Sequence, residues 1–116
     1  MNILLVYCHM EPGSLTASIK NIAAQELTAE GHSVAISDLY AQGFSAVAQK
    51  WDFVTTTGKH FNYSNEQKHA AELGMSFAPD ILGELEKIKA ADIVVFIDPL
   101  WWFNVPALLR GWFDRV

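Results

Sequence analysis

The chain has a single cysteine, no cluster of basic residues and no long apolar run, and each absence excludes a class of protein. Cys8 has no partner for an internal disulfide, which is typical of a reducing compartment. The net charge of -5, with scattered lysines and arginines, argues against a nucleic-acid-binding surface. No stretch approaches the roughly 18 apolar residues of a membrane span, and the N-terminus lacks the pattern of a signal peptide. We therefore expect a soluble cytoplasmic protein.

Common phosphate-binding and metal-binding motifs are missing as well. The stretch 8–17 has no G-x-x-x-x-G-K sequence, and Gly13 stands alone where a dinucleotide-binding fingerprint needs three glycines. The histidines show no spacing that suits a metal, so we expect no metal site. Cys8 ends an expected strand with no base nearby, which is more typical of a small buried residue than of a nucleophile.

Three apolar runs predict strands over residues 2–7, 33–39 and 93–97. The run at 93–97 is continuously apolar and mostly β-branched or aromatic, which is typical of a strand covered on both faces. At 116 residues and 51% hydrophobic, the chain is long enough for one domain with a core, and too short for two.

Apolar residues at helical spacing predict a first helix from Leu15 to about Glu30. Ser14 is its expected N-cap and Gly31 the residue that stops it. Its expected apolar face consists of Leu15, Ile19, Ile22, Ala23 and Leu27.

Two further helices are expected later in the chain. One opens at Pro79, and the last follows an Asn104 cap with Pro106 in its first turn. The apolar residues of this last helix are Leu108, Leu109, Trp112 and Phe113. Between residues 40 and 78, aromatic residues are scattered among polar ones. We interpret this segment as a functional excursion with short helical pieces, 65–73 being a candidate.

This order of elements predicts an α/β fold with a parallel sheet, helices on both faces and strand order 2-1-3. The strand 93–97 then has a free apolar edge, which native proteins avoid. We expect this edge and the last helix to be covered by a second copy of the chain, by another polypeptide or by two further strands.

Two loops are candidate sites. The loop 8–17 joins a strand to a helix N-terminus, where free N–H groups favour an anion such as phosphate, and His9 could pair with that anion. Taken alone, an ordinary turn with a serine cap is the more common explanation. The aromatic loop 99–103 fits a wall for a planar ligand, and it fits core or subunit interface equally well.

Residues 99–116 (PLWWFNVPALLRGWFDRV) resemble the P-L-x-W-F-x-V-P-A-x-L-K-G-W-F-[DE]-R-V segment of the NAD(P)H:quinone oxidoreductases, which are flavodoxin-like flavoenzymes. Residues 38–40 (DLY), Phe44 and residues 79–81 (PDI) also match. The resemblance covers the whole chain. It implies a three-layer α/β/α flavodoxin-like domain over 1–116, here the N-terminal half only.

The resemblance also implies a function and site residues. FAD, or FMN in some relatives, would pass electrons from NAD(P)H to a quinone in a ping-pong cycle. Carried over by position, the contacts at the phosphate end are His9, Ser14, Leu15, Thr16 and Ala17. Those at the flavin ring are Pro99, Leu100, Trp101, Trp102 and Phe103, and Asn62 would reach the cofactor across a homodimer.

Some residues depart from the family pattern. Leu15 and Thr16 replace an aromatic residue and an amide, and Trp101 stands where some relatives have glutamine. The family's T-T-G-G loop and a later Tyr and His lie outside this chain. A second interpretation is therefore a non-catalytic remnant, or a flavin-binding ancillary or regulatory partner, that associates through strand 93–97 and helix 106–115.

Overall fold

The computed structural model describes residues 1–58 and 60–116. Its sheet consists of three parallel strands, β1 (Asn2–Tyr7), β2 (Ser33–Asp38) and β3 (Ile93–Ile97), in the order β2-β1-β3. Leu5 of β1 pairs with Ile36 of β2 on one side and with Val95 of β3 on the other. The predicted parallel sheet and its strand order are confirmed.

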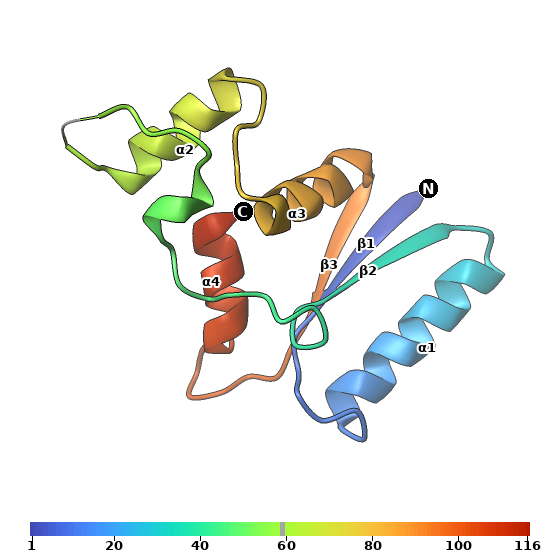
Figure 1. The fold of residues 1–116 in the computed structure, drawn as a ribbon. Coiled ribbons are helices and arrows are strands. Elements are labelled where there is room, and N and C mark those ends of the chain that lie inside the picture. The colour runs from blue at the N-terminus through green and yellow to red at the C-terminus, as the bar shows by residue number, and fades with distance from the viewer. Residues whose placement is uncertain (59) are drawn as a thin grey trace.

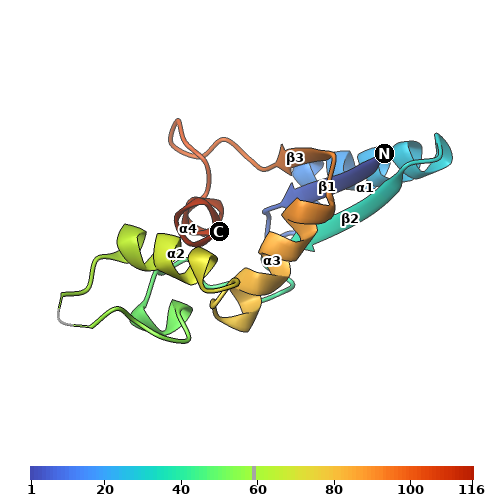
Figure 2. The ribbon, with the colours of Figure 1, turned by 90° about the horizontal axis from the view of Figure 1, so that it is seen from above.

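Helices cover both faces of this sheet, in three layers (Figures 1 and 2). On one face lies α1 (Leu15–Ala29), and on the other lie α3 (Pro79–Ala90) and α4 (Ala107–Arg115). The side chains of β1 alternate between the two faces, as a strand requires. Ile3, Leu5 and Tyr7 therefore pack with α1, while Leu4 and Val6 pack with α4.

The expected signals at helix ends are largely confirmed. Ser14 caps α1 by accepting the Ala17 N–H at 3.0 Å, and Gly31 ends that helix with a φ of +87°. Pro79 opens α3. The expectation for the last helix is wrong in detail, because Pro106 occupies the N-cap position of α4. The Oδ1 of Asn104 instead accepts a hydrogen bond from the N–H of Val105, its neighbour in the chain, at 2.8 Å.

The expected apolar face of α1 is only partly correct. Ala17 is buried, and Ala23, Ala24 and Leu27 pack against the core. Small alanines let the helix lie close to the sheet. Three bulkier residues remain outside this contact and are half or more exposed: Leu15, Ile19 and Ile22.

The strand β3 is less buried than its apolar sequence predicts. Ile93 is 42% exposed and Phe96 is 41% exposed, because β3 lies at the edge of the sheet and pairs with β1 alone. Expectations for the last helix are also corrected, since Leu109 and Trp112 are buried in the chain's own core and Phe113 is 45% exposed. A partner on this edge stays a prediction.

The excursion contains two short helices, as expected: η1 (Lys50–Asp52) and α2 (Tyr63–Glu72). Four of its aromatic residues pack on one another and on α3: Phe53, Phe61, Tyr63 and Phe77. The rings of Phe53 and Tyr63 are 5.1 Å apart, and Phe77 and Ile81 complete this small second core. This part of the excursion is therefore packed onto the rest of the fold.

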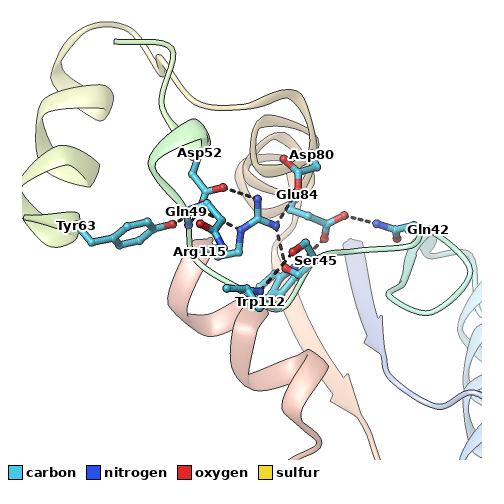
Figure 3. Close-up of polar contacts among 10 residues, drawn as sticks. Gln42, Ser45, Gln49, Asp52, Tyr63, Asp80, Glu84, Trp112 and Arg115 are labelled. Atoms are coloured by element: carbon cyan, nitrogen blue, oxygen red, sulfur yellow. Dashed lines mark hydrogen bonds and ion pairs between the residues drawn. The ribbon is translucent and has the colours of Figure 1, made fainter. Parts of the chain in front are cut away.

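A buried arginine at the end of α4 holds the excursion in place (Figure 3). The Arg115 side chain is 3% exposed and donates to both carboxylate oxygens of Asp52, at 2.7 and 3.1 Å, and to Asp80 at 2.8 Å. Tyr63 also donates to Asp52, at 2.6 Å. Burial alone would raise the pKa of Asp52. Hydrogen bonds from Arg115, Tyr63 and the backbone N–H of Gln49 outweigh the effect of burial, so the pKa is lowered.

A second buried carboxylate, Glu84 of α3, joins β2 to α4 (Figure 3). It accepts hydrogen bonds from Ser37 at 2.6 Å, Lys87 at 2.7 Å, and Gln42 and the Trp112 indole at 2.9 Å. Burial raises the pKa of Glu84, and these four donors more than offset it, so the pKa is lowered. Such a group is costly to disturb, because every donor loses its partner.

Replacing Glu84 should therefore destabilise the fold strongly. Glu84→Gln is expected to lower the free energy of unfolding at pH 7 by about 3 kcal/mol, measured by urea titration of tryptophan fluorescence. The folded pKa is depressed, so the stabilisation from Glu84 is present above the unfolded pKa of about 4.3 and is lost as the pH falls through the folded pKa. Glu86→Gln, on the exposed side of α3, is the control, and an equal loss in both variants would contradict this account.

Replacing Gly111 by alanine should destabilise the fold, whereas the same change at Gly83 should not. A Cβ on Gly111 of α4 would overlap the backbone of Ala46, whereas a Cβ on Gly83 of α3 meets nothing within 4 Å. We expect Gly111→Ala to destabilise by at least about 2 kcal/mol, and Gly83→Ala to stabilise by up to about 1 kcal/mol. Thermal unfolding of the two variants tests this difference in sign.

Candidate functional site

Two loops leave the sheet together at its carboxyl edge. The N–H of Cys8 donates to the carbonyl of Ile97 at 3.1 Å, one residue beyond the paired strands. From this point the β1–α1 loop (residues 8–14) and the β3–α4 loop (residues 98–106) diverge. They meet again where the His9 and Trp101 rings lie edge to face, with centroids 5.8 Å apart. The two candidate loops of the sequence are therefore in contact with each other.

The β1–α1 loop presents free backbone donors at the start of α1. Ala17 and Ser18 donate to Ser14, which satisfies two N–H groups of the first turn. The N–H groups of Leu15 and Thr16 find no acceptor within residues 1–58 and 60–116. The Leu15 side chain is 77% exposed. An anion here would meet backbone N–H groups and the positive end of the helix dipole.

Glu11, an exposed residue, makes three hydrogen bonds within this loop. Its N–H donates to His9 Nδ1 at 2.9 Å, so the ring must carry its proton on Nε2 to accept it. Its carboxylate accepts the N–H of Gly13 at 2.8 Å, and its carbonyl accepts the N–H of Ser14 at 3.1 Å. The loop therefore has a fixed shape before any ligand binds.

The aromatic loop is a tight turn with two bulky residues in an unfavourable conformation. Trp101 and Asn104 exchange two backbone hydrogen bonds of 3.0 Å. Between them, Trp102 has a φ of +50° and Phe103 a φ of +63°, the pattern of a type I′ turn. Such turns normally use Asn or Gly, and a bulky residue costs about 1–2 kcal/mol there.

This turn holds two aromatic rings away from the core. The side chains of Trp102 and Phe103 are each 94% exposed, and that of Leu100 is 76% exposed. Packing in the chain's own core, one of the two structural explanations of the sequence, is therefore wrong for these residues. A strained turn that exposes large apolar surface is typical of a binding site. Pro99 and Trp101 form its more sheltered base.

A groove of about 470 Å³ adjoins the β1–α1 loop on the side of β2. It is lined by His9, Lys20, Asp38 and Tyr40, among others, and the Lys20 Nζ lies 4.8 Å from the centroid of the Tyr7 ring. A larger groove of about 570 Å³ lies at the opposite, amino edge of the sheet beside α3. That groove is remote from both loops.

Two further groups at the carboxyl edge have raised pKa values. Burial raises the pKa of the Cys8 thiol to about 11, which agrees with its predicted place as a small buried residue. Burial also raises the pKa of Asp98, which directly follows β3. A thiol with this pKa is almost wholly protonated at pH 7 and is a poor nucleophile.

Asn62, the remaining predicted contact, lies elsewhere. It caps α2 by accepting the N–H of Asn65 at 3.1 Å. In both views α2 lies beyond α4 from α1 (Figures 1 and 2), so the chain does not bring Asn62 to its own two loops. The interpretation that it reaches the cofactor of a partner stays a prediction.

Two residues shape these loops in a way that the sequence does not predict. Glu11 lies within the predicted loop 8–17, and its carboxylate accepts the N–H of Gly13. Asn104 was expected to cap α4 and instead closes the aromatic turn. No local signal predicts two aromatic residues at positive φ.

The whole chain, residues 1–116, matches the family model described as a flavodoxin-like fold. The chain belongs to the flavodoxin-like family. Among relatives of this family, the human protein named ribosyldihydronicotinamide dehydrogenase [quinone] is 45% identical over 98% of this chain and 50% of its own length. The rat protein named NAD(P)H dehydrogenase [quinone] 1 is 39% identical over 97% of this chain and 42% of its own.

Solved structures agree with this membership of the flavodoxin-like family. A putative quinone reductase from Klebsiella pneumoniae superposes with a TM-score of 0.91 at 40% identity, over 99% of this chain and 44% of that one. An NAD(P)H:quinone oxidoreductase from Methanothermobacter marburgensis superposes with a TM-score of 0.76 at 27% identity, over 99% and 52%. The chain spans about half the length of the curated relatives it matches.

If the aromatic turn stores strain for binding, glycine should relieve it. Phe103→Gly is expected to raise the free energy of unfolding by about 1 kcal/mol, because glycine tolerates a φ of +63°. Trp51→Gly is the matched control, since Trp51 is 74% exposed and its φ is not positive. Glycine there should destabilise. Urea unfolding of both variants measures the difference, and a loss of stability in Phe103→Gly would refute the assignment of strain.

Proposed function

We propose that the protein binds a flavin and uses it to reduce quinones with electrons from NAD(P)H. The observation that carries this proposal is the meeting of the two loops, with His9 and Trp101 in ring contact at 5.8 Å. One loop offers donors for phosphate and the other an apolar wall for a flat ring system. The names of the human and rat relatives, both quinone dehydrogenases, support the same activity.

The residues of the site suit the two ends of a flavin. Free N–H groups of Leu15 and Thr16, with the hydroxyls of Ser14 and Thr16, suit its phosphate, and His9 Nε2–H adds a further donor. Ala17 contributes mainly by being small, since its N–H already donates to Ser14. Residues 99–103 suit the isoalloxazine ring. We propose FAD as the cofactor, with FMN as the alternative.

In this proposal the chain supplies binding and orientation. A flavin bound there would supply the redox chemistry of the proposed ping-pong cycle, in which a hydride is taken from NAD(P)H and two electrons are then given to a quinone. The ring contact between His9 and Trp101 holds the two loops next to each other, so that one ligand could reach both. Trp102 and Phe103, held outward by the turn, would cover an apolar ring and exclude water from one side of it.

We further propose a cytoplasmic protein that associates through its open edge, as a homodimer or with another chain. The edge of β3, with Ile93 and Phe96 more than 40% exposed, and the exposed Phe113 support association. In such an assembly Asn62 would face the partner's cofactor. No helix in the described part of the chain is long and apolar enough to cross a membrane.

The same open edge favours a second candidate function. In that function the protein would bind flavin without turning over substrate, as an ancillary or regulatory partner. It would associate through β3 and α4. The two candidates differ in turnover and share the flavin site.

Purified protein separates these candidates directly. We expect it to be yellow or to become so with FAD, with the two visible absorption bands of a flavin, and to oxidise NAD(P)H when a quinone is added. Bound flavin without turnover would favour the ancillary role. Colourless protein that neither retains FAD or FMN nor reduces a quinone would defeat both.

Removing one aromatic ring tests the proposed wall. Trp102→Ala should weaken flavin binding at least about fivefold, because one stacked aromatic ring contributes about 1–3 kcal/mol. Trp51→Ala, which removes an exposed indole from the excursion, should change it less than twofold. Fluorescence titration gives both dissociation constants, and equal effects would mean that the turn does not meet the ring.

A further inference from the structure

The groove on the β2 side of the β1–α1 loop brings together two opposite charges that do not pair. Lys20 of α1 and Asp38 at the end of β2 both line it, and both side chains are half-buried. Every ion pair in the described ranges, 1–58 and 60–116, is formed by other side chains. The groove measures about 470 Å³. This volume is typical of small-ligand pockets, which span roughly 300–1,000 Å³.

Each of the two charges is held by a contact that leaves it available to a ligand. The Nζ of Lys20 lies over the ring of Tyr7, 4.8 Å from the centroid, in a cation–π contact. The Oδ1 of Asp38 accepts the N–H of Ala41 at 3.1 Å, and the other carboxylate oxygen accepts no hydrogen bond from the described part of the chain. The two side chains therefore keep their positions without meeting, and the space between them is open to a ligand.

Tyr7 borders both charges and neutralises neither. Its side chain is 3% exposed, and burial raises the pKa of its hydroxyl, with the nearby charge of Asp38 adding to the rise. The phenol is therefore uncharged at pH 7 and leaves the charge of Lys20 without a counter-ion. The outer part of the groove adds an apolar wall, which consists of Met10, Pro12 and Tyr40.

We infer that this groove binds an α-amino acid with an aromatic side chain. The carboxylate of the amino acid pairs with Lys20, and its ammonium group pairs with the free oxygen of Asp38. Its ring lies against the apolar wall, where the thioether of Met10 and the ring of Tyr40 are exposed and suit an aromatic partner. Charge complementarity selects a zwitterion, because Asp38 repels a simple anion and Lys20 repels a simple cation. The inference does not rest on the proposed flavin site.

Three ligands test the contribution of each charge. L-phenylalanine carries both charges, hydrocinnamate lacks the ammonium group, and phenethylamine lacks the carboxylate. Each analogue leaves one charge of the groove without a hydrogen-bonded partner, so both should bind at least about fivefold more weakly than L-phenylalanine. Titration followed by proton–nitrogen correlation NMR measures the three dissociation constants. It also locates the site, because the amides of Asn21 and Ala41 should shift and that of Ala90, in the groove beside α3, should not.

Two substitutions should give opposite patterns with the two analogues. Lys20→Met keeps the apolar stem and removes the positive charge, so it should weaken L-phenylalanine at least about fivefold without weakening phenethylamine. Asp38→Asn keeps an acceptor for the N–H of Ala41 and removes the negative charge, so it should weaken L-phenylalanine by a similar factor without weakening hydrocinnamate. The unaffected analogue shows in each case that the groove is intact. Lys89→Met, on the exposed side of α3, is the control and should change no dissociation constant.

Three results would overturn the inference. The first is equal affinity for L-phenylalanine and its two analogues, and the second is an equal loss of all three ligands in either groove variant. The third is the absence of saturable L-phenylalanine binding up to about 10 mM, which corresponds to an affinity too weak for a specific site. Each of these results leaves the proposed flavin site untouched, because none of the measurements involves a flavin.

Discussion

The hydrogen bond from the Cys8 N–H to the Ile97 carbonyl is the point on which the site depends. It is the last rung between β1 and β3, and both loops start from it. Parallel pairing places the carboxyl ends of the two strands at one edge, where α/β folds form ligand crevices. The contact between His9 and Trp101 then follows from short loops leaving one point. Weakening this hydrogen bond would move the backbone N–H groups of the β1–α1 loop away from the aromatic loop.

Much of the fold follows from patterns that are local in the sequence. Ser14, Gly31 and Pro79 act within one turn of where they stand, so their effect on helix ends could be predicted. Burial could not, because it depends on the neighbours that a residue receives in three dimensions. The apolar run of β3 suggested a covered strand, and the sheet order leaves it at an edge with Phe96 41% exposed.

The site shows the same division between local signals and global constraints. Both loops were identified from composition and from their place after a strand. The turn that exposes Trp102 and Phe103 was not, because two bulky residues at positive φ contradict local preference and persist only when the surroundings enforce them. Here the ladder between Trp101 and Asn104 enforces it, and the buried network of Arg115 fixes the far end of α4. The chain stores strain at the loop where binding is proposed and offsets it with stabilising interactions elsewhere in the fold, such as those of Arg115 and Glu84.

The central claim is that the two loops bind a single flavin, with phosphate at the start of α1 and the ring on the aromatic turn. A crystal structure of the chain with FAD tests this most directly. The account predicts the phosphates within hydrogen-bonding distance of the N–H groups of Leu15 and Thr16, and the isoalloxazine ring against residues 99–103. A ring bound in the groove beside α3, or phosphates away from α1, would contradict it.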